Sequence, residues 1–200
     1  MGRPREHDEQ TRERLLAAAA GILHAEGIGA LSARRLAAEV EVSTRAIYSL
    51  FDGMNGVLGE LFRRGAEELV RRHEQVPRCA DAAEEIVPLA LAYRAGALAS
   101  PAMYGLLMER AAPQFVPPPE LIEYVFRSSA RVQDAVERAL RQRRLRRDAG
   151  LITRQLWSVV HGHASLELKG MLGAPAAAEA QLRSTIETMV AGLLPGRPRE

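Results

Sequence analysis

The chain has 200 residues, 47% of them apolar, and a formal charge of +2, so it can build a substantial core but is not basic enough to indicate nucleic acid binding by charge alone. No apolar run approaches the ~18 to 20 residues that cross a bilayer, and the start of the chain is too charged for a signal peptide, so we expect a cytoplasmic protein. The single cysteine, Cys79, excludes a disulfide framework, and the abundance of Arg, with Lys169 the only lysine, indicates a GC-rich bacterial genome.

The periodicity of apolar residues is helical almost throughout, and no window shows the alternation of a strand, so we expect an all-α protein. A first helix carries one apolar stripe and ends at Gly27; the stripe consists of Leu15, Leu16, Ala19, Ile22 and Leu23. Ser32 is the expected N-cap of a short second helix, whose apolar face is Leu36, Ala37 and Val40.

Two more helices follow at once. Ser43 is the expected N-cap of a third helix, whose inner face is Ala46, Ile47, Leu50 and Phe51. A fourth, longer helix is expected from about Met54 to His73, with an apolar stripe of Val57, Leu58, Leu61, Phe62, Ala66 and Leu69.

Residues 32–51 have the spacing of a helix-turn-helix, in which the second helix enters the major groove of DNA by its N-terminal end. Thr44 and Arg45 suit contacts to base edges, Ser43 and Tyr48 suit contacts to phosphates, and Arg34 suits either. An exposed, capped turn between two core helices explains the same pattern without DNA.

The stretch from Gly27 to Leu61, "GIGALSARRLAAEVEVSTRAIYSLFDGMNGVLGEL", resembles the N-terminal domain of the TetR family of bacterial transcriptional regulators. The resemblance rests on Gly27, Leu31-Ser32, Leu36-Ala37, Val42-Ser43 and above all on Tyr48 with Phe51. It implies a three-helix DNA-binding head within residues 9–73, and places on the DNA-facing surface Arg34, Ser43, Thr44, Arg45 and Tyr48.

The resemblance has two departures. Glu41 stands in the turn where the family usually has glycine, which implies either backbone strain or a different turn. Met54 stands where the family usually has a lysine that reaches the DNA backbone, so one phosphate contact per subunit is lost.

Beyond a polar joint, residues 80–194 are expected to form a second helical domain. Its helices are expected at about Asp81 to Ser100, Ala102 to Arg110, Glu120 to Arg144, Asp148 to Leu172 and Ala176 to Leu194, with prolines at several boundaries. The proline-rich stretch 112–120, "APQFVPPPE", cannot be helical throughout.

The stretch "LWSVVHGHASLELKG", residues 156–170, resembles a block of one subclass of TetR C-terminal domains. The resemblance implies a homodimer, in which the last two long helices of each subunit pair, and a two-fold protein suits a pseudo-palindromic double-stranded operator. The residues expected at this interface are Gly162, Leu166, Leu182, Ile186, Met189 and Val190.

The resemblance also implies a small-molecule pocket in the C-terminal domain. Adaptable apolar side chains favour an apolar or amphipathic effector, although each candidate is also an ordinary core residue. The candidates are Tyr93, Met103, Tyr104, Leu107, Met108, Phe115, Tyr124, Phe126, Trp157 and His161.

An enzymatic function is not expected, and neither a cofactor nor a metal is implied. His161 and His163 are two residues apart on a helix and point about 200° apart, so they cannot share an ion. The basic run Arg138 to Asp148 suits either phosphates or a solvated helix end. Two hypotheses remain: a ligand-responsive DNA-binding repressor, or a helical homodimer that binds a small molecule or protein partner while its DNA-binding head is silent.

Overall fold

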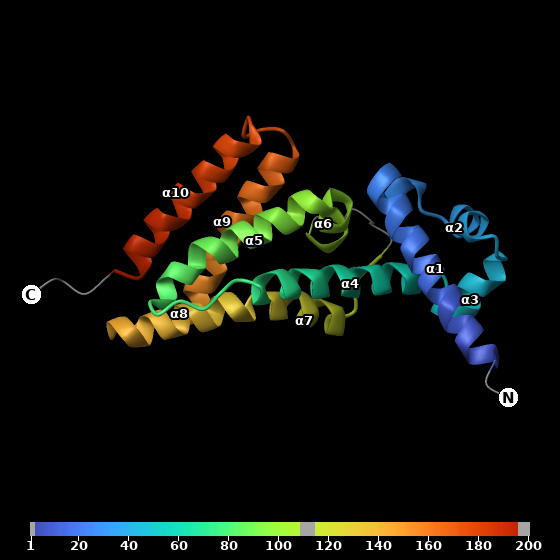
Figure 1. Cartoon of the computed structure of the whole chain (residues 1–200), viewed down its shortest axis with the longest axis horizontal. Helices are drawn as coiled ribbons and strands as arrows, with labels where there is room; N and C mark the ends of the chain where they lie inside the picture. The colour runs from blue at the N-terminus through green and yellow to red at the C-terminus, as the bar shows by residue number, and fades with distance from the viewer. Residues whose placement is uncertain (1–2, 109–114, 196–200) are drawn as a thin grey trace, which may run out of the picture. The chain divides into compact units, whose positions relative to one another are not determined.

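The computed structural model describes residues 3–108 and 115–195 (Figure 1), and within those ranges every regular element is a helix. The α-helices are α1 (Arg3–Glu26), α2 (Ala33–Val40), α3 (Thr44–Phe51), α4 (Met54–Glu74), α5 (Ile86–Ala99), α6 (Pro101–Met108), α7 (Pro119–Ser128), α8 (Ala130–Arg143), α9 (Ala149–Leu168) and α10 (Pro175–Leu193). Two short 3-10 helices precede α2 and α5, namely η1 (Ile28–Ala30) and η2 (Ala82–Glu85). The all-α prediction is therefore confirmed.

The chain packs as two compact units. One unit combines Met1–Glu67 with Ser100–Tyr124, and the other combines Glu68–Ala99 with Val125–Glu200. The sequence did not predict that Ser100–Tyr124 packs with the N-terminal residues. The functional division into residues 9–73 and 80–194 stays a prediction.

The first unit is built around the three helices predicted for the N-terminal domain. α1 packs against α2, α3 and α6, and α2 packs against α3. The predicted stripes of α1 and α4 are buried in full, as is the predicted face of α2. Burial of these aliphatic and aromatic side chains fixes the positions of α2 and α3, which carry the predicted contact residues.

The second unit is centred on α5, which packs against α8, α9 and α10 (Figure 1). Arg94 of α5 is buried, and its guanidinium donates to both carboxylate oxygens of Glu167 on α9 at 2.7 and 2.6 Å, and to Glu179 of α10 at 2.8 Å. The hydrogen bonds that Arg94 donates to Glu167 raise the pKa of Arg94 further, and burial is the main opposing effect. One buried arginine thus joins three helices of this unit.

The single helix predicted from Glu120 to Arg144 is wrong, because the chain breaks between α7 and α8. At the break, the Ser128 hydroxyl donates to the Val125 carbonyl and the Ser129 hydroxyl to the Phe126 carbonyl, both at 2.6 Å. Serine side chains compete with the helical backbone for hydrogen bonds in this way, and two in succession end α7.

The other predicted boundaries agree with the structure to within a few residues. The helix expected at 102–110 corresponds to α6, and its last two expected residues, 109 and 110, lie outside the described residues. Of the proline-rich stretch 112–120, residues 115–118 are not helical and α7 begins at Pro119, while residues 112–114 lie outside the described part of the chain.

Within the described residues, no single helix has both the length and the apolar composition of a membrane span. Only the broken pair Ala82–Ala99 and Pro101–Met108 passes such a test, on length and composition alone.

Candidate functional site

Glu41 is the C-cap of α2, and its backbone adopts the left-handed conformation in the turn to α3. Its backbone has φ 57° and ψ 43°, a conformation that glycine adopts with less strain than glutamate. The Val42 N–H donates to the Ala37 carbonyl at 3.0 Å and the Glu41 N–H to the Ala38 carbonyl at 3.3 Å, which is the Schellman pattern. The sequence left two alternatives for Glu41, backbone strain or a different turn. The structure has the left-handed turn, so the Glu41 backbone is strained.

The five predicted DNA-contact residues are all exposed, on α2 and at the start of α3: Arg34, Ser43, Thr44, Arg45 and Tyr48. Ser32 caps α2 as predicted, since its hydroxyl accepts from the Arg35 N–H at 3.3 Å. Ser43 occupies the N-cap position of α3, but its hydroxyl makes no capping hydrogen bond. The Ser43 hydroxyl and the first N–H groups of α3 are therefore available to an anion such as a phosphate.

The arginines of this surface differ in their partners. Arg35 pairs with Glu26 at 3.2 Å and with Glu39, and the hydrogen bond that it donates to Glu39 raises the pKa of Arg35. Arg34 and Arg45 have no acidic partner among the described residues. Their guanidinium groups can therefore meet phosphates or a guanine edge without first breaking an ion pair.

Two arginines of α1 contact the ends of α2 and α3, the helices that carry the predicted DNA-contact residues. The Arg14 guanidinium donates to the Val40 carbonyl at the end of α2 at 2.9 Å. The Arg12 guanidinium lies 4.9 Å from the centre of the Phe51 ring at the end of α3 and 3.6 Å from the Glu60 carboxylate. Cation–π and ionic contacts thus add to the apolar packing of the head.

The entry into α4 depends on two glycines. Gly53 has φ 90°, and a Cβ there would lie 3.3 Å from the ring of Tyr48. A Cβ on Gly56 would overlap the Phe51 carbonyl, so only glycine fits. The Tyr48 ring, 63% exposed, therefore lies along the α3–α4 turn, and its hydroxyl can reach a phosphate.

The second unit contains a small apolar cavity of about 30 Å³, a volume with room for no more than one or two water molecules. It is lined by His73, Ile86, Leu89, Ala90, Tyr93, Ser128, Ser129, Val132, Thr153, Leu156, Trp157, Val160 and Ile186. A larger ligand must displace side chains, and Trp157, which is 39% exposed, lies in the wall.

His73 is a buried titratable group in the wall of this cavity. Its Nδ1 lies 2.6 Å from the Ser128 carbonyl oxygen, and its Nε2 is buried without a hydrogen-bond partner. Burial lowers the pKa of His73, whereas the carbonyls of Ser128 and Leu89 oppose that shift; the Leu89 carbonyl lies outside good hydrogen-bond geometry. The imidazole is therefore neutral near pH 7.

The predicted pocket residues do not all lie at this cavity. Tyr93 and Trp157 line it, and His161 stacks on Trp157 at 5.2 Å and lies 3.3 Å from the Tyr93 hydroxyl. Phe126 belongs to the same unit but is 65% exposed. The remaining six pack in the other unit: Met103, Tyr104, Leu107, Met108, Phe115 and Tyr124.

The sequence did not point to His73, Ser128 or Thr153 as cavity residues. The predicted fourth helix ends at His73, and Ser128 lies inside the helix predicted from Glu120 to Arg144, which the structure breaks into α7 and α8. The consecutive serines, 128 and 129, were the available indication of a break there.

The predicted dimer residues divide into two groups. Leu182 and Ile186 are fully buried within the chain, which excludes them from a surface that a second subunit could cover. They lie on the face of α10 that packs on α5 and α9. Leu166 is 43% exposed, and Gly162, Met189 and Val190 are partly exposed, so these four stay candidates.

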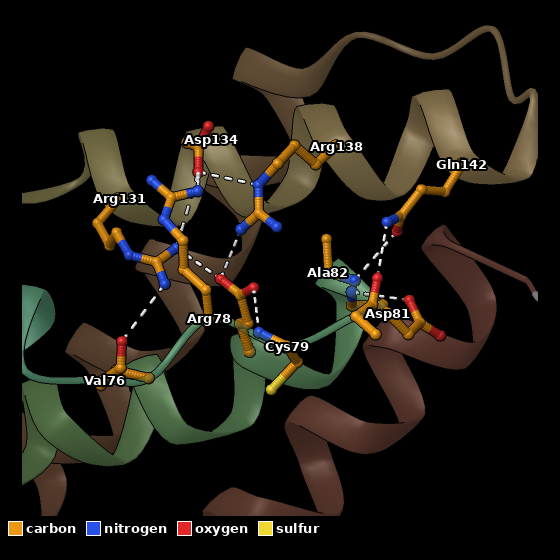
Figure 2. Close-up of polar contacts among 12 residues, drawn as sticks. Val76, Arg78, Cys79, Asp81, Ala82, Arg131, Asp134, Arg138 and Gln142 are labelled. Atoms are coloured by element: carbon orange, nitrogen blue, oxygen red, sulfur yellow. Dashed lines mark hydrogen bonds and ion pairs between the residues drawn. The ribbon is translucent and has the colours of Figure 1, made fainter.

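Most of the basic run from Arg138 to Asp148 is engaged within the chain. Arg131 and Arg138 of α8, both labelled in Figure 2, donate to the same carboxylate, that of Glu85, which is fully buried and lies 2.6 Å from each guanidinium. The same carboxylate accepts from the Cys79 N–H at 2.7 Å, and Gln142 bonds the backbone of Ala80 and Ala82.

Farther along the run, Arg143 pairs with Asp81 at 2.6 Å, and Arg147 donates to the carbonyls of Gly192 and Leu193. The contacts of Arg138, Gln142 and Arg143 fasten the segment after α4 to α8, and those of Arg147 fasten the segment after α8 to the end of α10. They favour a structural role for the run over phosphate binding.

Two family models match the sequence. "Bacterial regulatory proteins, tetR family" matches residues 15–61, and "Tetracyclin repressor-like, C-terminal domain" matches residues 86–189. No curated protein sequence matches the chain.

Several solved bacterial structures have a similar fold. A protein of unknown function from Rhodococcus sp. RHA1 is 28% identical with a TM-score of 0.77, over 92% of this chain and 95% of that one. The TetR family protein ActR from Streptomyces coelicolor, solved with (S)-DNPA, is 23% identical with a TM-score of 0.62, over 92% and 96%. The transcriptional regulator FadR from Bacillus subtilis, solved with stearoyl-CoA, is 14% identical with a TM-score of 0.70, over 90% and 98%.

At these identities ActR and FadR share the fold alone, whereas the C-terminal family model by itself matches more than half of the sequence. The exposed helix-turn-helix and the apolar cavity agree with both family models. The chain therefore belongs to the TetR family of bacterial transcriptional regulators, with a DNA-binding domain at its N-terminus and a ligand-binding domain at its C-terminus.

Proposed function

We propose that the protein is a homodimeric repressor, which binds a pseudo-palindromic operator through α3 and leaves it when an apolar or amphipathic effector binds the C-terminal domain. The observation that carries this proposal is that Arg34 and Arg45 are exposed and have no acidic partner among the described residues, while the exposed Ser43 hydroxyl at the front of α3 makes no capping hydrogen bond. Exposed donors at the front of a second helix are what base edges and phosphates require.

Arg45 and Thr44 are assigned to base edges, and Ser43 and Tyr48 to phosphates, with Arg34 suited to either. The first two set sequence preference, because base edges differ between base pairs and phosphates do not. The others set affinity and its dependence on salt.

A gel-shift assay with DNA from upstream of the protein's own coding sequence tests the proposal. We expect retardation that weakens as salt is raised. Tyr48→Phe should weaken binding by about 1 kcal/mol per subunit on all sequences alike, because it removes one hydrogen bond to a phosphate. Absence of salt-dependent retardation on every upstream fragment would refute DNA binding.

The effector proposal rests on the small apolar cavity and its aromatic wall, Tyr93 and Trp157. ActR was solved with (S)-DNPA and FadR with stearoyl-CoA, so similar folds do accommodate organic ligands. A panel of apolar and amphipathic compounds, screened by the rise in melting temperature, would identify ligands, since binding to the native state alone raises stability.

One observation favours the second candidate, a helical homodimer with a weak or silent head. Glu41 places an exposed carboxylate in the turn, and Met54 offers no charge at the start of α4. Both features weaken attraction to phosphates. Retention of ligand binding in a protein that fails the gel-shift assay would support this alternative.

A further inference from the structure

His73 lies in the cavity wall with one ring nitrogen paired and the other unpaired. The side chain is 3% exposed, so neither nitrogen is hydrated as it would be at the surface. A buried nitrogen without a partner is unusual, because nearly all buried polar atoms in proteins form hydrogen bonds.

The contact at Nδ1 determines which nitrogen carries the proton. A backbone carbonyl only accepts hydrogen bonds, so the 2.6 Å contact between Nδ1 and the Ser128 oxygen requires Nδ1–H. The ring is neutral, because burial lowers its pKa. Nε2 therefore presents a lone pair, and it can accept a hydrogen bond but cannot donate one.

The serine and threonine hydroxyls of the cavity wall are already committed to helix carbonyls, and the Tyr93 hydroxyl lies 3.3 Å from His161 Nδ1. Thr153 donates to Ala149 at 2.8 Å, and Ser128 and Ser129 donate to Val125 and Phe126 at 2.6 Å. Arg131, whose charge acts on His73, is bound to the buried Glu85 carboxylate at 2.6 Å. His73, a residue of this apolar wall, thus carries an unsatisfied acceptor, and Arg131 adds no uncommitted positive charge.

We propose that the effector is an apolar molecule with a neutral hydroxyl or N–H group, which donates a hydrogen bond to Nε2 of His73 while its apolar part replaces the side-chain contacts of Trp157 and Leu156. A carboxylate is excluded, because it would bury a charge against a lone pair. This inference rests on the proposed function, in that the C-terminal domain binds an effector.

The position of His73 also connects the ligand to the helix that enters the head. α4 is one continuous helix, which begins three residues after the end of α3 and ends one residue after His73. A ligand that binds Nε2 of His73 therefore contacts the last turn of α4.

The test compares three compounds on one framework with the full-length protein: a para-alkylphenol, the matching methyl ether and the matching benzoate, with alkyl chains from propyl to octyl. Binding is measured by calorimetry. We expect the phenol to bind at least about tenfold more tightly than the ether or the benzoate, because only the phenol satisfies Nε2. Equal binding of phenol and ether, tightest binding of the benzoate, or no binding of any phenol in the series would overturn the proposal.

The variant His73→Leu tests whether His73 causes the preference for the phenol over the ether. In His73→Leu, phenol and ether should bind with equal affinity, whereas the exposed histidine control His24→Leu should keep the preference. A preference that persists in His73→Leu would overturn the assignment. The comparison in the unmodified protein decides the proposal even if His73→Leu fails to fold.

A gel shift with the same preparations separates this inference from the proposed function. Operator binding without phenol binding refutes the ligand inference and leaves the repressor intact. Phenol binding to a protein that does not retard DNA supports the ligand inference and refutes the repressor.

Discussion

At the scale of single residues, the DNA-binding surface depends on which arginines are free. Of the three arginines on α2 and α3, one, Arg35, is engaged by Glu26 and Glu39. Arg34 and Arg45 have no acidic partner in the described part of the chain, so their guanidiniums are available. Composition and net charge do not distinguish these residues, because the difference arises from the acidic neighbours that folding brings to Arg35.

Glu41 gives the first prediction at this scale. Glu41→Gly should stabilise the protein by about 1 kcal/mol, because glycine adopts the left-handed turn without strain, and it should also raise DNA affinity by removing a negative charge. Glu41→Gln should raise DNA affinity to a similar extent while leaving stability nearly unchanged. Urea denaturation and DNA titration together measure both effects.

The two variants separate backbone strain from charge. If Glu41→Gln stabilises the protein as much as Glu41→Gly, the strain assigned to the turn is not the cause. If neither variant binds DNA more tightly, the carboxylate does not face the phosphates.

At the scale of helices, apolar period and capping residues predicted the N-terminal part of the fold well. The stripes of α1 and α4 and the Ser32 cap agree with the structure. The break at Ser128 was missed because serine hydroxyls satisfy carbonyls that a helix would otherwise use. Leu182 and Ile186 of α10 are predicted at the dimer interface but are buried within the chain, because periodicity identifies an apolar stripe and not the helix that covers it.

The same limit applies to the cavity. Tyr93 and Trp157 were candidates as large aromatic side chains, but the assignment of Met103 and Phe115 to the other unit depends on long-range packing. His73 acquires its properties from Ser128, 55 positions away in sequence. No local pattern carries such a contact.

The exposed face of α9 gives the prediction at the helix scale. Leu151 and Leu166 are exposed on α9, with Ser158 and Gly162 between them on the same face, which suits close packing against a second copy. Leu166→Glu should weaken the dimer at least about tenfold, measured by sedimentation equilibrium, because it places a charge in the interface.

Ile122→Glu on α7 is the matched control, since Ile122 is 41% exposed and Leu166 is 43% exposed. It should leave the dimer unchanged. Equal effects of the two substitutions, or no effect of Leu166→Glu, would remove α9 from the interface.

At the scale of the whole molecule, stability should depend on acidic pH through Glu85. Burial raises the pKa of this carboxyl, but hydrogen bonds from Arg138, the Cys79 N–H and Arg131 outweigh burial and lower the pKa from 4.5 to about 2. The unfolded state therefore binds more protons between these values. The contribution is complete above pH 4.5 and is lost as pH falls toward 2.

Urea midpoints between about pH 5 and 3 measure this contribution. Glu85→Gln should lower stability near neutral pH by about 2 kcal/mol and flatten the decline with acid, because both arginines lose their buried partner. The exposed Glu123→Gln should follow the unmodified protein. An unchanged pH profile in Glu85→Gln would assign the acid sensitivity to other carboxylates, such as Glu60.

Sequence-specific DNA binding by the front of α3 is tested most directly by titrating the upstream operator, and operators with single base changes, against the unmodified protein, Arg45→Ala and Arg35→Ala by fluorescence anisotropy. Arg45→Ala should lose about 1 to 3 kcal/mol of discrimination at one position of each half-site. Arg35→Ala, which removes the same charge from an existing ion pair, should keep the full preference. Equal losses in both variants, or an unchanged preference in Arg45→Ala, would contradict the assignment of α3 as the reading helix.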